Sequence, residues 1–400
     1  MEDLVTPHAR LFQDVYNGKR VLVTGHTGFK GSWLCAWLMR LCAEVRGYAL
    51  PPPTDPNHFD RLALGMKSVI GDVRDQEKLR RTLEEFSPDI VFHLAAQPIV
   101  RRSYDDPVGT FTSNSLGTMH VLEACRALKT VRAVIVITSD KCYENKEWSW
   151  GYRENDRLGG DDPYSASKAC AELIAACWRN SFFSPKTYGK EHRTLLATVR
   201  AGNVLGGGDW AADRIIPDVA RAAGAGEQVL IRNPQAVRPW QHVLEPLSGY
   251  LLLGQRLLEG RPELCGAWNF GPSEESRITV GDLVAFAAAS WPSVAYRMNG
   301  GSNGNEPAET GSLMLDSAKA RSELGWTPVW HIETAVSRTI SWYRAFYERQ
   351  ELRTAGDIDR FVHDAAMKRA QWASSDMVRR NNMHREPPAN EYEGVRLPPS

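Results

Sequence analysis

The first half of the chain alternates short apolar runs with longer stretches in which apolar residues recur at helical spacing. The apolar runs predict strands, and the amphipathic stretches predict helices. Because the runs are apolar throughout, they are typical of parallel strands that are buried on both faces. We expect strands at residues 19–24, 44–50, 67–73, 89–96, 132–138 and 194–203, and helices at residues 31–42, 76–86, 113–128 and 164–182.

The order of these elements, strand–helix–strand–helix–strand, is that of a doubly wound nucleotide-binding fold. From about Leu205 the pattern changes to shorter helical segments separated by loops that contain Gly and Pro. We therefore expect an α/β protein in which a Rossmann-type doubly wound parallel sheet precedes a smaller C-terminal α/β domain. The predicted boundaries are residues 15–204 for the nucleotide-binding domain, 205–350 for the smaller domain and 351–400 for a polar tail with little core.

The composition excludes several classes of partner. The 400 residues carry 48 basic and 48 acidic side chains, so no net charge favours nucleic acid or an anionic membrane. No apolar stretch approaches the roughly 18 residues of a membrane span. The seven cysteines form no CxxC pair, which argues against a disulfide framework or a zinc site. We expect a soluble cytoplasmic protein without a metal, in which Cys35, Cys125, Cys170 and Cys177 are small buried hydrophobes.

A glycine-rich turn joins the first predicted strand to the first predicted helix. It places Gly25, Gly28 and Gly31 in the stretch VLVTGHTGFKGSW. Glycine permits a tight turn there, and the free N–H groups of the following helix can hold a pyrophosphate. A purely structural loop is the alternative, but a strand before the turn and a helix after it are the context that a dinucleotide site requires.

The ribose-binding position leaves the choice between NAD and NADP open. An acidic residue about 20 residues after the glycines usually binds the ribose 2′-hydroxyl of NAD. The second predicted strand instead ends in Gly47, Tyr48 and Ala49. Arg46 in the same strand raises NADP as an alternative. Asp72, after the third predicted strand, is well placed to meet the adenine amino group.

A Tyr/Lys pair opens the predicted helix at residues 164–182. Tyr164 and Lys168 are four residues apart in PYSASK, so both side chains lie on one face of the helix. A neighbouring ammonium should lower the phenol pKa from about 10, so that Tyr164 can accept a proton near neutral pH. A surface pair is the common alternative. Ser139, at the end of a predicted strand, favours instead a catalytic triad that binds a substrate hydroxyl.

Six segments of the chain together resemble one family. They look like those of the extended short-chain dehydrogenases that act as nucleotide-sugar 4,6-dehydratases, and they are TGHTGFKGSWL, HLAAQPIV, TSDKCY, DPYSASK, RAGNVLGGGDW and RPWQHVLEP. The resemblance covers about residues 15 to 350. After the strand, dTDP- and GDP-sugar dehydratases typically have Thr-Asp-Glu. This chain has Ser139, Asp140 and Lys141, which resembles the CDP-glucose branch.

The resemblance implies dehydration of CDP-D-glucose to its 4-keto-6-deoxy form, with tightly bound NAD regenerated in each turnover. Tyr164 would take the proton of the 4-hydroxyl while a hydride passes to NAD, and Lys168 would hold the nicotinamide ribose. Asp140 would protonate the departing 6-hydroxyl. Lys141 would replace the usual Glu base, which requires a pKa far below about 10.4; otherwise its charge would stabilise the enolate. The sequence leaves both roles of Lys141 open.

The resemblance also implies the binding residues and the partners. The expected contacts of NAD are Gly25, Thr27, Gly28, Phe29, Gly31, Asp72, Val73, Ala95, Tyr164 and Lys168, and those of the nucleotide sugar are Gln97, Asn203, Arg214, Arg238 and His242. The planar fork of Arg238 suits a phosphate, whereas ordinary surface placement is an equal alternative for Arg214 and His242.

Residues 205–350 would mainly bind this small-molecule substrate, and we expect a homodimer that binds neither nucleic acid nor membrane. Other functions stay open at this point, among them another nucleotide-sugar 4,6-dehydratase and another short-chain oxidoreductase that acts on a nucleotide sugar. A 4-epimerase needs the Tyr/Lys pair but no acid and base at the strand end. A catalytically idle dinucleotide-binding sensor predicts a damaged triad, whereas Ser139, Tyr164 and Lys168 are all present.

Overall fold

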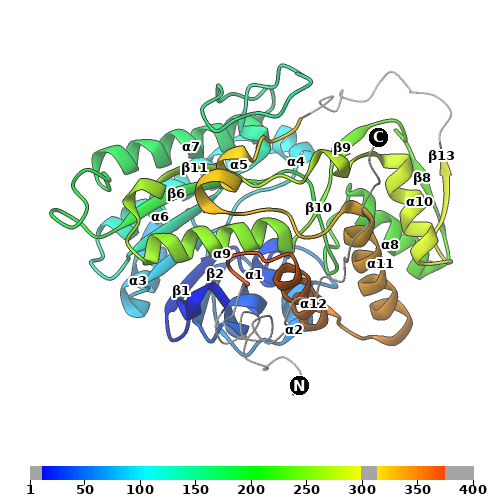
Figure 1. Ribbon diagram of the computed structural model, residues 1–400, viewed down its shortest axis with the longest axis horizontal. Helices are drawn as coiled ribbons and strands as arrows, with labels where there is room; N and C mark the ends of the chain where they lie inside the picture. Colours follow the sequence, from blue (N-terminus) through cyan, green and yellow to red (C-terminus); the bar gives the residue numbers. More distant parts are fainter. Residues whose placement is uncertain (1–10, 299–312, 374–400) are drawn as a thin grey trace, which may run out of the picture.

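The computed structural model describes residues 11–298 and 313–373 (Figure 1). At its centre is a sheet of seven parallel strands in the order β11-β6-β5-β4-β1-β2-β3. In the register of the sheet, Val21 of β1 lies between Val45 of β2 and Ile90 of β4. The strands are β1 (Arg20–Thr24), β2 (Glu44–Ala49), β3 (Lys67–Ile70), β4 (Ile90–His93), β5 (Ala133–Ile137), β6 (Leu195–Arg200) and β11 (Gly266–Asn269). The first six confirm the strands that the apolar runs predict.

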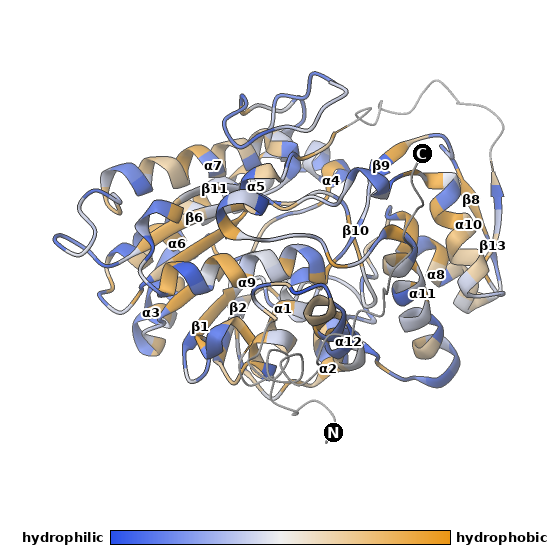
Figure 2. Ribbon diagram, viewed as in Figure 1, coloured by the Kyte–Doolittle hydropathy of each residue, from blue (hydrophilic) through white to orange (hydrophobic). Residues whose placement is uncertain are grey.

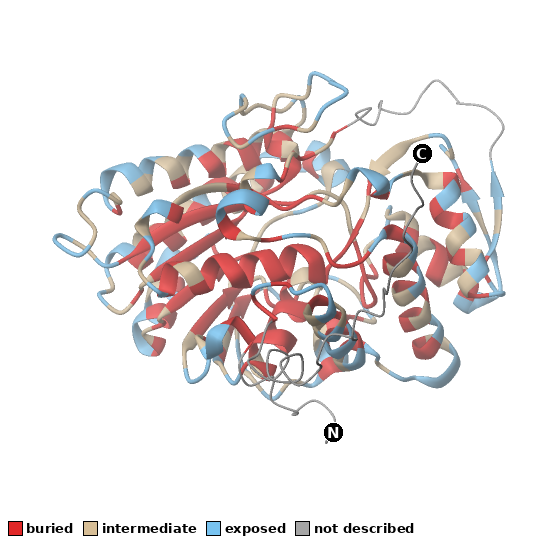
Figure 3. Ribbon diagram, in the orientation of Figure 1, coloured by how far each residue is buried: buried red, intermediate tan, exposed pale blue. Residues whose placement is uncertain are grey.

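Helices cover both faces of this sheet, because successive side chains of each strand point into two different apolar layers. In β1, Val21 and Val23 face one layer and Leu22 faces the other. The first layer is closed by α1 (Phe29–Arg40) and α9 (Leu244–Leu258), and the second by α3 (Gln76–Phe86), α6 (Gly117–Arg126) and α7 (Pro163–Ser181). Figure 2 shows the apolar strands between these helices, and Figure 3 shows that α9 is buried along most of its length. The predicted doubly wound Rossmann-type fold is confirmed.

Shorter elements precede β1 or lie in the connections between the strands. They are η1 (Leu11–Asp14), α2 (His58–Leu62), α4 (Val100–Asp105), α5 (Pro107–Phe111), the π-helix η2 (Thr112–Leu116) and the 3-10 turn η3 (Asp140–Cys142). Of these, α4, α5 and η2 pack against α7, so the segment between β4 and α6 and the helix after β5 form one surface.

Beyond β6 the chain builds a smaller α/β region, at the right of Figure 1. Its strands pair as three short sheets, β7 with β10, β9 with β12 and β8 with β13. Its elements are β7 (Val204–Leu205), α8 (Ile215–Ala225), β8 (Gln228–Ile231), β9 (Val237–Pro239), β10 (Gln241–His242), η4 (Pro262–Leu264), η5 (Glu274–Ser276), β12 (Arg277–Thr279), α10 (Val280–Ser290), β13 (Ala295–Met298), η6 (Ala320–Leu324) and α11 (Ile332–Arg349). The boundary at residue 204 stays a prediction. Two elements beyond it are part of the larger layer: β11 is a strand of the large sheet, and α9 packs on that sheet.

The C-terminal region contains more core than its polar composition predicts. Helix α12 (Thr354–Met367) packs against α1. Phe361 and Trp372 are both buried and stack with their ring centroids 5.8 Å apart. The prediction of a tail with little core is therefore wrong for residues 351–373, because a few apolar residues at helical spacing suffice to bury one face of a polar helix. Residues 374–400 of that predicted tail lie outside the described residues.

Two expectations about the whole chain can be compared with the described residues. No helix among them is long and apolar enough to cross a membrane. All seven cysteines fall within them and are unpaired. Cys35 and Cys125 are buried as predicted and Cys170 is half-buried, whereas Cys177 is exposed. Its predicted burial is wrong because it lies on the solvent side of α7.

Candidate active site

The site residues predicted from sequence lie mainly at the carboxyl ends of the parallel strands. The strand order changes direction at β1, which has β2 on one side and β4 on the other. Such a switch point leaves a crevice beyond the strand ends, where ligands of this architecture bind. The turn after β1, the segment after β4 and the ends of β5 and β6 all meet there.

The glycine turn after β1 has the geometry of a nucleotide-binding turn. Gly25 has a φ of +74°, and a Cβ on it would lie 2.6 Å from the backbone nitrogen of Ala95. A Cβ on Gly31 would lie 2.2 Å from the carbonyl oxygen of Gly25, so only glycine fits at either position. Gly28, directly before the first residue of α1, provides no side-chain cap for the helix. The first N–H groups of α1 are therefore available to an anion such as a diphosphate.

Two further predicted cofactor contacts anchor this turn. The Thr27 hydroxyl donates to the carbonyl oxygen of Leu50, just past the end of β2, at 2.9 Å. A Cβ on Gly206 would lie 3.1 Å from the ring of Phe29, so the start of α1 lies against the loop that follows β7. The turn is thus held between the second strand and the smaller α/β region.

The adenine side of the predicted cofactor site lies after β3. The carboxylate of Asp72 accepts a hydrogen bond from Arg74 at 2.6 Å, which lowers the pKa of that carboxyl. Val73 is buried beside it. Arg46, the residue that raised NADP as an alternative, holds its guanidinium 4.4 Å over the ring of Phe86. The contact of Arg46 with Phe86 therefore does not support NADP, whose 2′-phosphate would need a guanidinium at the end of β2.

A 3-10 turn directly after β5 holds the candidate acid. The Ser139 hydroxyl donates to Oδ1 of Asp140 at 2.9 Å and accepts the backbone N–H of Lys141 at 3.2 Å. Asp140 is only 7% exposed, and a Cβ on Gly202 would lie 2.9 Å from its Oδ2. Burial raises the pKa of the Asp140 carboxyl, against the positive charge of Lys141 and the hydrogen bond of Ser139. Such a carboxyl keeps its proton to a higher pH than an exposed one.

Helix α7 brings the Tyr/Lys pair to the same place. It starts after Asp162, whose carboxylate accepts the backbone N–H of Ser165 at 2.9 Å. Pro163 in the first turn needs no hydrogen-bond acceptor, which suits a helix start. Tyr164 and Lys168 follow on the inner face of α7 and are both buried. The structure thus brings together all five residues predicted to be catalytic.

The pKa of Tyr164 differs from the sequence-based expectation. Burial raises it to about 12, and hydrogen bonding with Ser139 offsets only part of this rise. Lys168 donates from Nζ to the carbonyl oxygen of Ile137 at 3.4 Å, and burial together with the charge of a neighbouring lysine lowers its own pKa to about 8. The predicted lowering of the Tyr164 pKa by Lys168 is wrong here, because desolvation of the phenolate outweighs the effect of the ammonium.

Two of the predicted substrate residues lie beside this catalytic group. Asn203 comes directly after Gly202, and its carbonyl oxygen accepts the backbone N–H of Gln241 at 3.2 Å. Arg214 donates from Nη1 to Asp209 at 2.7 Å, and its charge favours the ionised form of the Tyr164 phenol. A half-buried guanidinium whose charge acts on Tyr164 is more than ordinary surface placement.

Two other predicted substrate residues lie further out. Arg238 is half-buried in the middle of β9, opposite Ile278 of β12, and its contact with substrate stays a prediction. Gln97 uses its side-chain amide within the protein. It donates to Ile99 and Thr110 at 3.0 Å each and accepts the N–H of Ile99 at 2.6 Å. Its role is to shape the segment after β4, and a substrate contact would have to displace these bonds.

His242 does not fit its predicted role. It is 1% exposed, and its ring makes edge contacts with Trp33 and Trp330. Burial lowers its pKa to about 3. The predicted substrate contact is therefore wrong, because the aromatic side chains of α1 and of the segment before α11 enclose the imidazole.

A buried ion pair behind the catalytic residues escaped prediction from the sequence. Arg200, at the end of β6, donates to both carboxylate oxygens of Glu172 at 2.9 Å each. Thr138 and Thr198 donate to the same carboxylate, and Arg200 also donates to the phenol of Tyr143 at 2.6 Å. The position of Glu172, four residues after Lys168, was the available signal. Tyr143, although it follows the catalytic turn, is thus part of a structural network.

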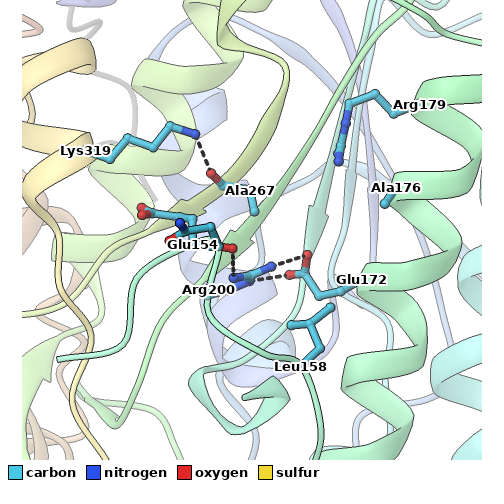
Figure 4. A pocket seen from close by; sticks show the side chains of 9 residues that line it. Glu154, Leu158, Glu172, Ala176, Arg179, Arg200, Ala267 and Lys319 are labelled. Carbon is cyan, nitrogen blue, oxygen red and sulfur yellow. Dashed lines mark hydrogen bonds and ion pairs between the residues drawn. The ribbon is translucent and has the colours of Figure 1, made fainter. Parts of the chain in front are cut away.

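A cavity of about 350 Å³ lies against this ion pair (Figure 4). Arg179 projects towards it from α7, and Lys319 donates to the carbonyl oxygen of Ala267 at 2.9 Å. Its other lining residues include Glu154, Leu158, Glu172 and Arg200. None of the residues predicted for catalysis or binding lines this cavity, so the ion pair separates it from the site at the strand ends.

Comparison with known proteins agrees with this geometry. A family model described as the NAD dependent epimerase/dehydratase family matches residues 21–269. The chain is 50% identical over 342 residues to the CDP-glucose 4,6-dehydratase of Salmonella typhimurium, across 85% of this chain and 94% of that protein. It is 25% identical over 341 residues to the dTDP-glucose 4,6-dehydratase of Xanthomonas campestris, across 80% of this chain and 92% of that protein.

A solved structure supports the same assignment. The UDP-glucose 4-epimerase of Thermus thermophilus, in complex with NAD, superposes with a TM-score of 0.68 at 25% identity, over 81% of this chain and 99% of that one. The part of the chain that the family model matches, residues 21–269, includes the glycine turn, Asp140 after β5 and the Tyr164/Lys168 pair. The chain belongs to the NAD dependent epimerase/dehydratase family.

Proposed function

We propose that the protein is a CDP-D-glucose 4,6-dehydratase, which converts CDP-D-glucose to CDP-4-keto-6-deoxy-D-glucose and water. The observation that carries the proposal is Asp140, a buried carboxyl with a raised pKa that is hydrogen-bonded to Ser139 beside Tyr164. A 4-epimerase needs no acid at this position. The 50% identity to the Salmonella typhimurium CDP-glucose 4,6-dehydratase supports the choice of nucleotide sugar.

The residues of the glycine turn fit the cofactor on which the family depends. Gly25 and Gly31 allow the tight turn, and α1 offers uncapped N–H groups to a diphosphate. When bound, NAD accepts the hydride of C4 and returns it to C6, and we propose that it stays bound through the turnover. The residues proposed to hold it are Gly25, Thr27, Gly28, Phe29, Gly31, Asp72, Val73 and Ala95, together with Tyr164 and Lys168.

In the first half of the reaction, Tyr164 accepts the proton of the 4-hydroxyl as C4 is oxidised. Its pKa of about 12 means that the phenol must be ionised by the charges around it before it can act as a base. Arg214 already favours the phenolate. We propose that Ser139 holds the same 4-hydroxyl and that Lys168 of α7, whose ammonium reaches the carbonyl oxygen of Ile137 at the end of β5, holds the nicotinamide ribose.

In the second half, the new 4-ketone acidifies the proton on C5. A base removes that proton, Asp140 protonates the 6-hydroxyl, and water leaves. One proton leaves O4 and one leaves C5, while the departing 6-hydroxyl takes one and C5 takes one back, so the protons balance. Ser139 interacts with both Tyr164 and Asp140 and so provides a short route between them.

Lys141 has two chemically distinct roles in this scheme. Its charge acts on Asp140 next to it, which supports the proposal that Lys141 acts where the C5 proton is taken and the enolate forms. A neutral lysine would take the proton, whereas a charged one would stabilise the enolate. The variant Lys141→Arg separates the two roles, because arginine keeps the charge but does not act as a base.

The nucleotide diphosphate would be held by the loop after β6 and by the smaller α/β region. We propose Asn203, Arg214 and Arg238 for this task, since a guanidinium suits phosphate oxygens. Gln97 shapes the neighbouring loop, and His242 is left out of the proposal because it is buried.

The test is to incubate the purified protein with CDP-, dTDP-, GDP- and UDP-glucose, each carrying deuterium at C4. We expect turnover of the CDP sugar and deuterium at C6 of a 4-keto-6-deoxy product. A protein that contains the cofactor but forms no such product contradicts the proposal. Formation of the 4-epimer, with full turnover in Asp140→Asn, would establish the epimerase instead.

We further propose that the protein is a cytoplasmic homodimer. Three apolar side chains are exposed on the surface formed by α7 and the segment after β4, and they are Val108 (72%), Leu116 (43%) and Leu173 (59%). A second copy would cover them. The seven unpaired cysteines support a reducing compartment. Sedimentation of the protein and of Leu173→Glu tests the dimer, which the charged residue should dissociate.

A further inference from the structure

Lys30 is a charged residue of the glycine turn to which no role has been given so far. It is the second residue of α1, directly after Phe29, and it is half-buried. No acceptor in the described part of the chain takes a hydrogen bond from its ammonium. Helical side chains lean towards the helix N-terminus. In the first turn of a helix this direction leads towards the uncapped N–H groups, where a positive charge is unfavourable by itself.

The charged groups around Lys30 do not neutralise it. Those that act on it are Arg214, Lys168 and Asp140. Arg214 is paired with Asp209 at 2.7 Å, and Asp140 accepts the hydroxyl of Ser139 at 2.9 Å. Lys30 and Lys168 thus lie at one crevice beside the Arg214–Asp209 pair, and the carboxylate that faces them, Asp140, also feels the charge of Lys141, so the arrangement suits a bound anion.

The packing of α1 directs this anion towards the reaction centre. The ring of Phe29 lies against Gly206, in the loop that also leads to Arg214, and Gly202 leaves room for Asp140 at the end of β6. The first turn of α1 is therefore the place where the cofactor side and the substrate side of the site meet. Two diphosphates reach this place in the proposed reaction, one from the cofactor and one from the nucleotide sugar.

We propose that Lys30 is a further binding residue of this site and that its ammonium pairs with a diphosphate oxygen. The position of Lys30 on α1 favours the diphosphate of the cofactor, and its proximity to Arg214 favours that of the nucleotide sugar. The first source rests on the NAD dependence of the family, and the second rests on the proposed function.

The acid–base properties of Lys30 provide a readout that a structural role would not change. Burial and the charge of Arg214 lower its pKa to about 8. A bound diphosphate raises the pKa again, because it stabilises the ammonium. At pH 8, binding should therefore be accompanied by proton uptake, part of which is lost when the ammonium is removed. Lys168, whose pKa is also about 8, accounts for the remainder.

The experiment uses the full-length protein after removal of copurified cofactor. NAD and CDP are titrated separately by calorimetry at pH 8, in two buffers of different ionisation enthalpy, so that affinity and proton uptake are both measured. The variants are Lys30→Met and Lys30→Gln, which remove the charge, and Lys30→Arg, which keeps it. The control is Lys67→Met. It removes an exposed lysine at the amino end of β3, whereas the site lies at the carboxyl ends of the strands.

We expect both neutral variants to bind one diphosphate roughly tenfold to a hundredfold more weakly, as for one charge-assisted hydrogen bond. Proton uptake on binding should fall in the same two variants. The affinity of Lys30→Arg should stay within about threefold of that of the unaltered protein, and the affinity of Lys67→Met should match it. Weaker binding of NAD alone identifies the cofactor as the source, and weaker binding of CDP alone identifies the nucleotide sugar.

Unchanged affinity and unchanged proton uptake in both folded neutral variants would overturn the proposal. The result is independent of turnover. If Lys30 proves necessary for NAD binding and CDP-glucose is not a substrate, the proposed function fails and the assignment of Lys30 to the cofactor stands.

Discussion

Glu172 and Lys168, one turn apart on α7, each belong to a group of charged side chains, and the two groups differ in how completely their atoms are paired. In the rear group, Glu172 and Arg200 are each 3% exposed at the side chain, and both carboxylate oxygens accept two donors. In the front group, Lys168 makes one hydrogen bond of 3.4 Å, and Lys30 makes none within the described residues. The rear group is complete without a ligand, and the front group is not.

This difference separates structural charge from functional charge. A buried charge is tolerated when hydrogen bonds and an opposite charge compensate for its lost hydration. Where they do not, the protein keeps the charges only if a bound molecule completes the arrangement, and their pKa values shift accordingly. The pKa of Lys168 is lowered to about 8, while Arg200 holds the pKa of Glu172 below its usual range. We therefore expect changes in the front group to affect turnover and changes in the rear group to affect stability.

The largest expected effect is that of Tyr164→Phe in the front group. Loss of the phenol removes the proposed base for the 4-hydroxyl, so turnover of CDP-glucose should fall about 10³- to 10⁴-fold. The free energy of unfolding should change by less than about 1 kcal/mol, because Ser139 is the one hydrogen-bond partner of the phenol among the described residues. Product formation and urea denaturation measure the two effects.

The matched control is Tyr143→Phe in the rear group. The Tyr143 phenol accepts from Arg200 at 2.6 Å and donates to Asn269 at 2.8 Å. Its loss should cost about 1–3 kcal/mol of stability and leave turnover of the folded enzyme within about threefold. Equal losses of turnover in Tyr143→Phe and Tyr164→Phe would remove the distinction between the two groups.

The parts of the fold and the site that the sequence predicts are those determined by local pattern. Continuous apolar runs predicted the six strands, and the i, i+4 spacing placed Tyr164 and Lys168 on one face of α7. The residues that follow strands, such as Asp140, were predictable because parallel strands end at one edge. These features need no knowledge of what packs against them.

The parts that escaped prediction depend on contacts between distant segments. His242 is enclosed by Trp33 and Trp330, which are far from it in sequence, so its polar identity suggested a binding role that its burial contradicts. The pKa of Tyr164 depends on desolvation by the whole fold rather than on Lys168 alone. The C-terminal helix buries Phe361 although its segment is polar on average. Pattern and spacing do not report such burial.

The next effect is that of Arg200→Met in the rear group. Removal of the guanidinium leaves the Glu172 carboxylate buried without its counter-charge, which should cost about 3–4 kcal/mol of stability. The double variant Arg200→Met/Glu172→Gln should recover at least about 1 kcal/mol of this loss, because the remaining amide is neutral. Urea denaturation of the three proteins measures both values. A loss below about 1 kcal/mol in Arg200→Met would show that the pair is not required.

The smallest expected effect is that of His242, and it tests whether this residue affects stability, as the rear group does, or turnover, as the front group does. Its pKa is about 3 in the folded protein, against about 6.5 in an unfolded chain, because burial disfavours the imidazolium. A depressed pKa contributes stability above pH 6.5, and this stability is lost as the pH falls towards 3. Between pH 7.5 and pH 5.5 a single histidine of this kind costs about 1.4 kcal/mol.

In His242→Phe the same pH change should therefore reduce stability by about 1.4 kcal/mol less than in the unaltered protein. Phenylalanine keeps the edge contacts with Trp33 and Trp330. His363→Gln, at an exposed histidine, provides the comparison for the loss of an imidazole at the surface. The KM for CDP-glucose should also stay within about twofold in His242→Phe. A large rise in KM, with an unchanged pH dependence of stability, would return His242 to the front group as a substrate contact.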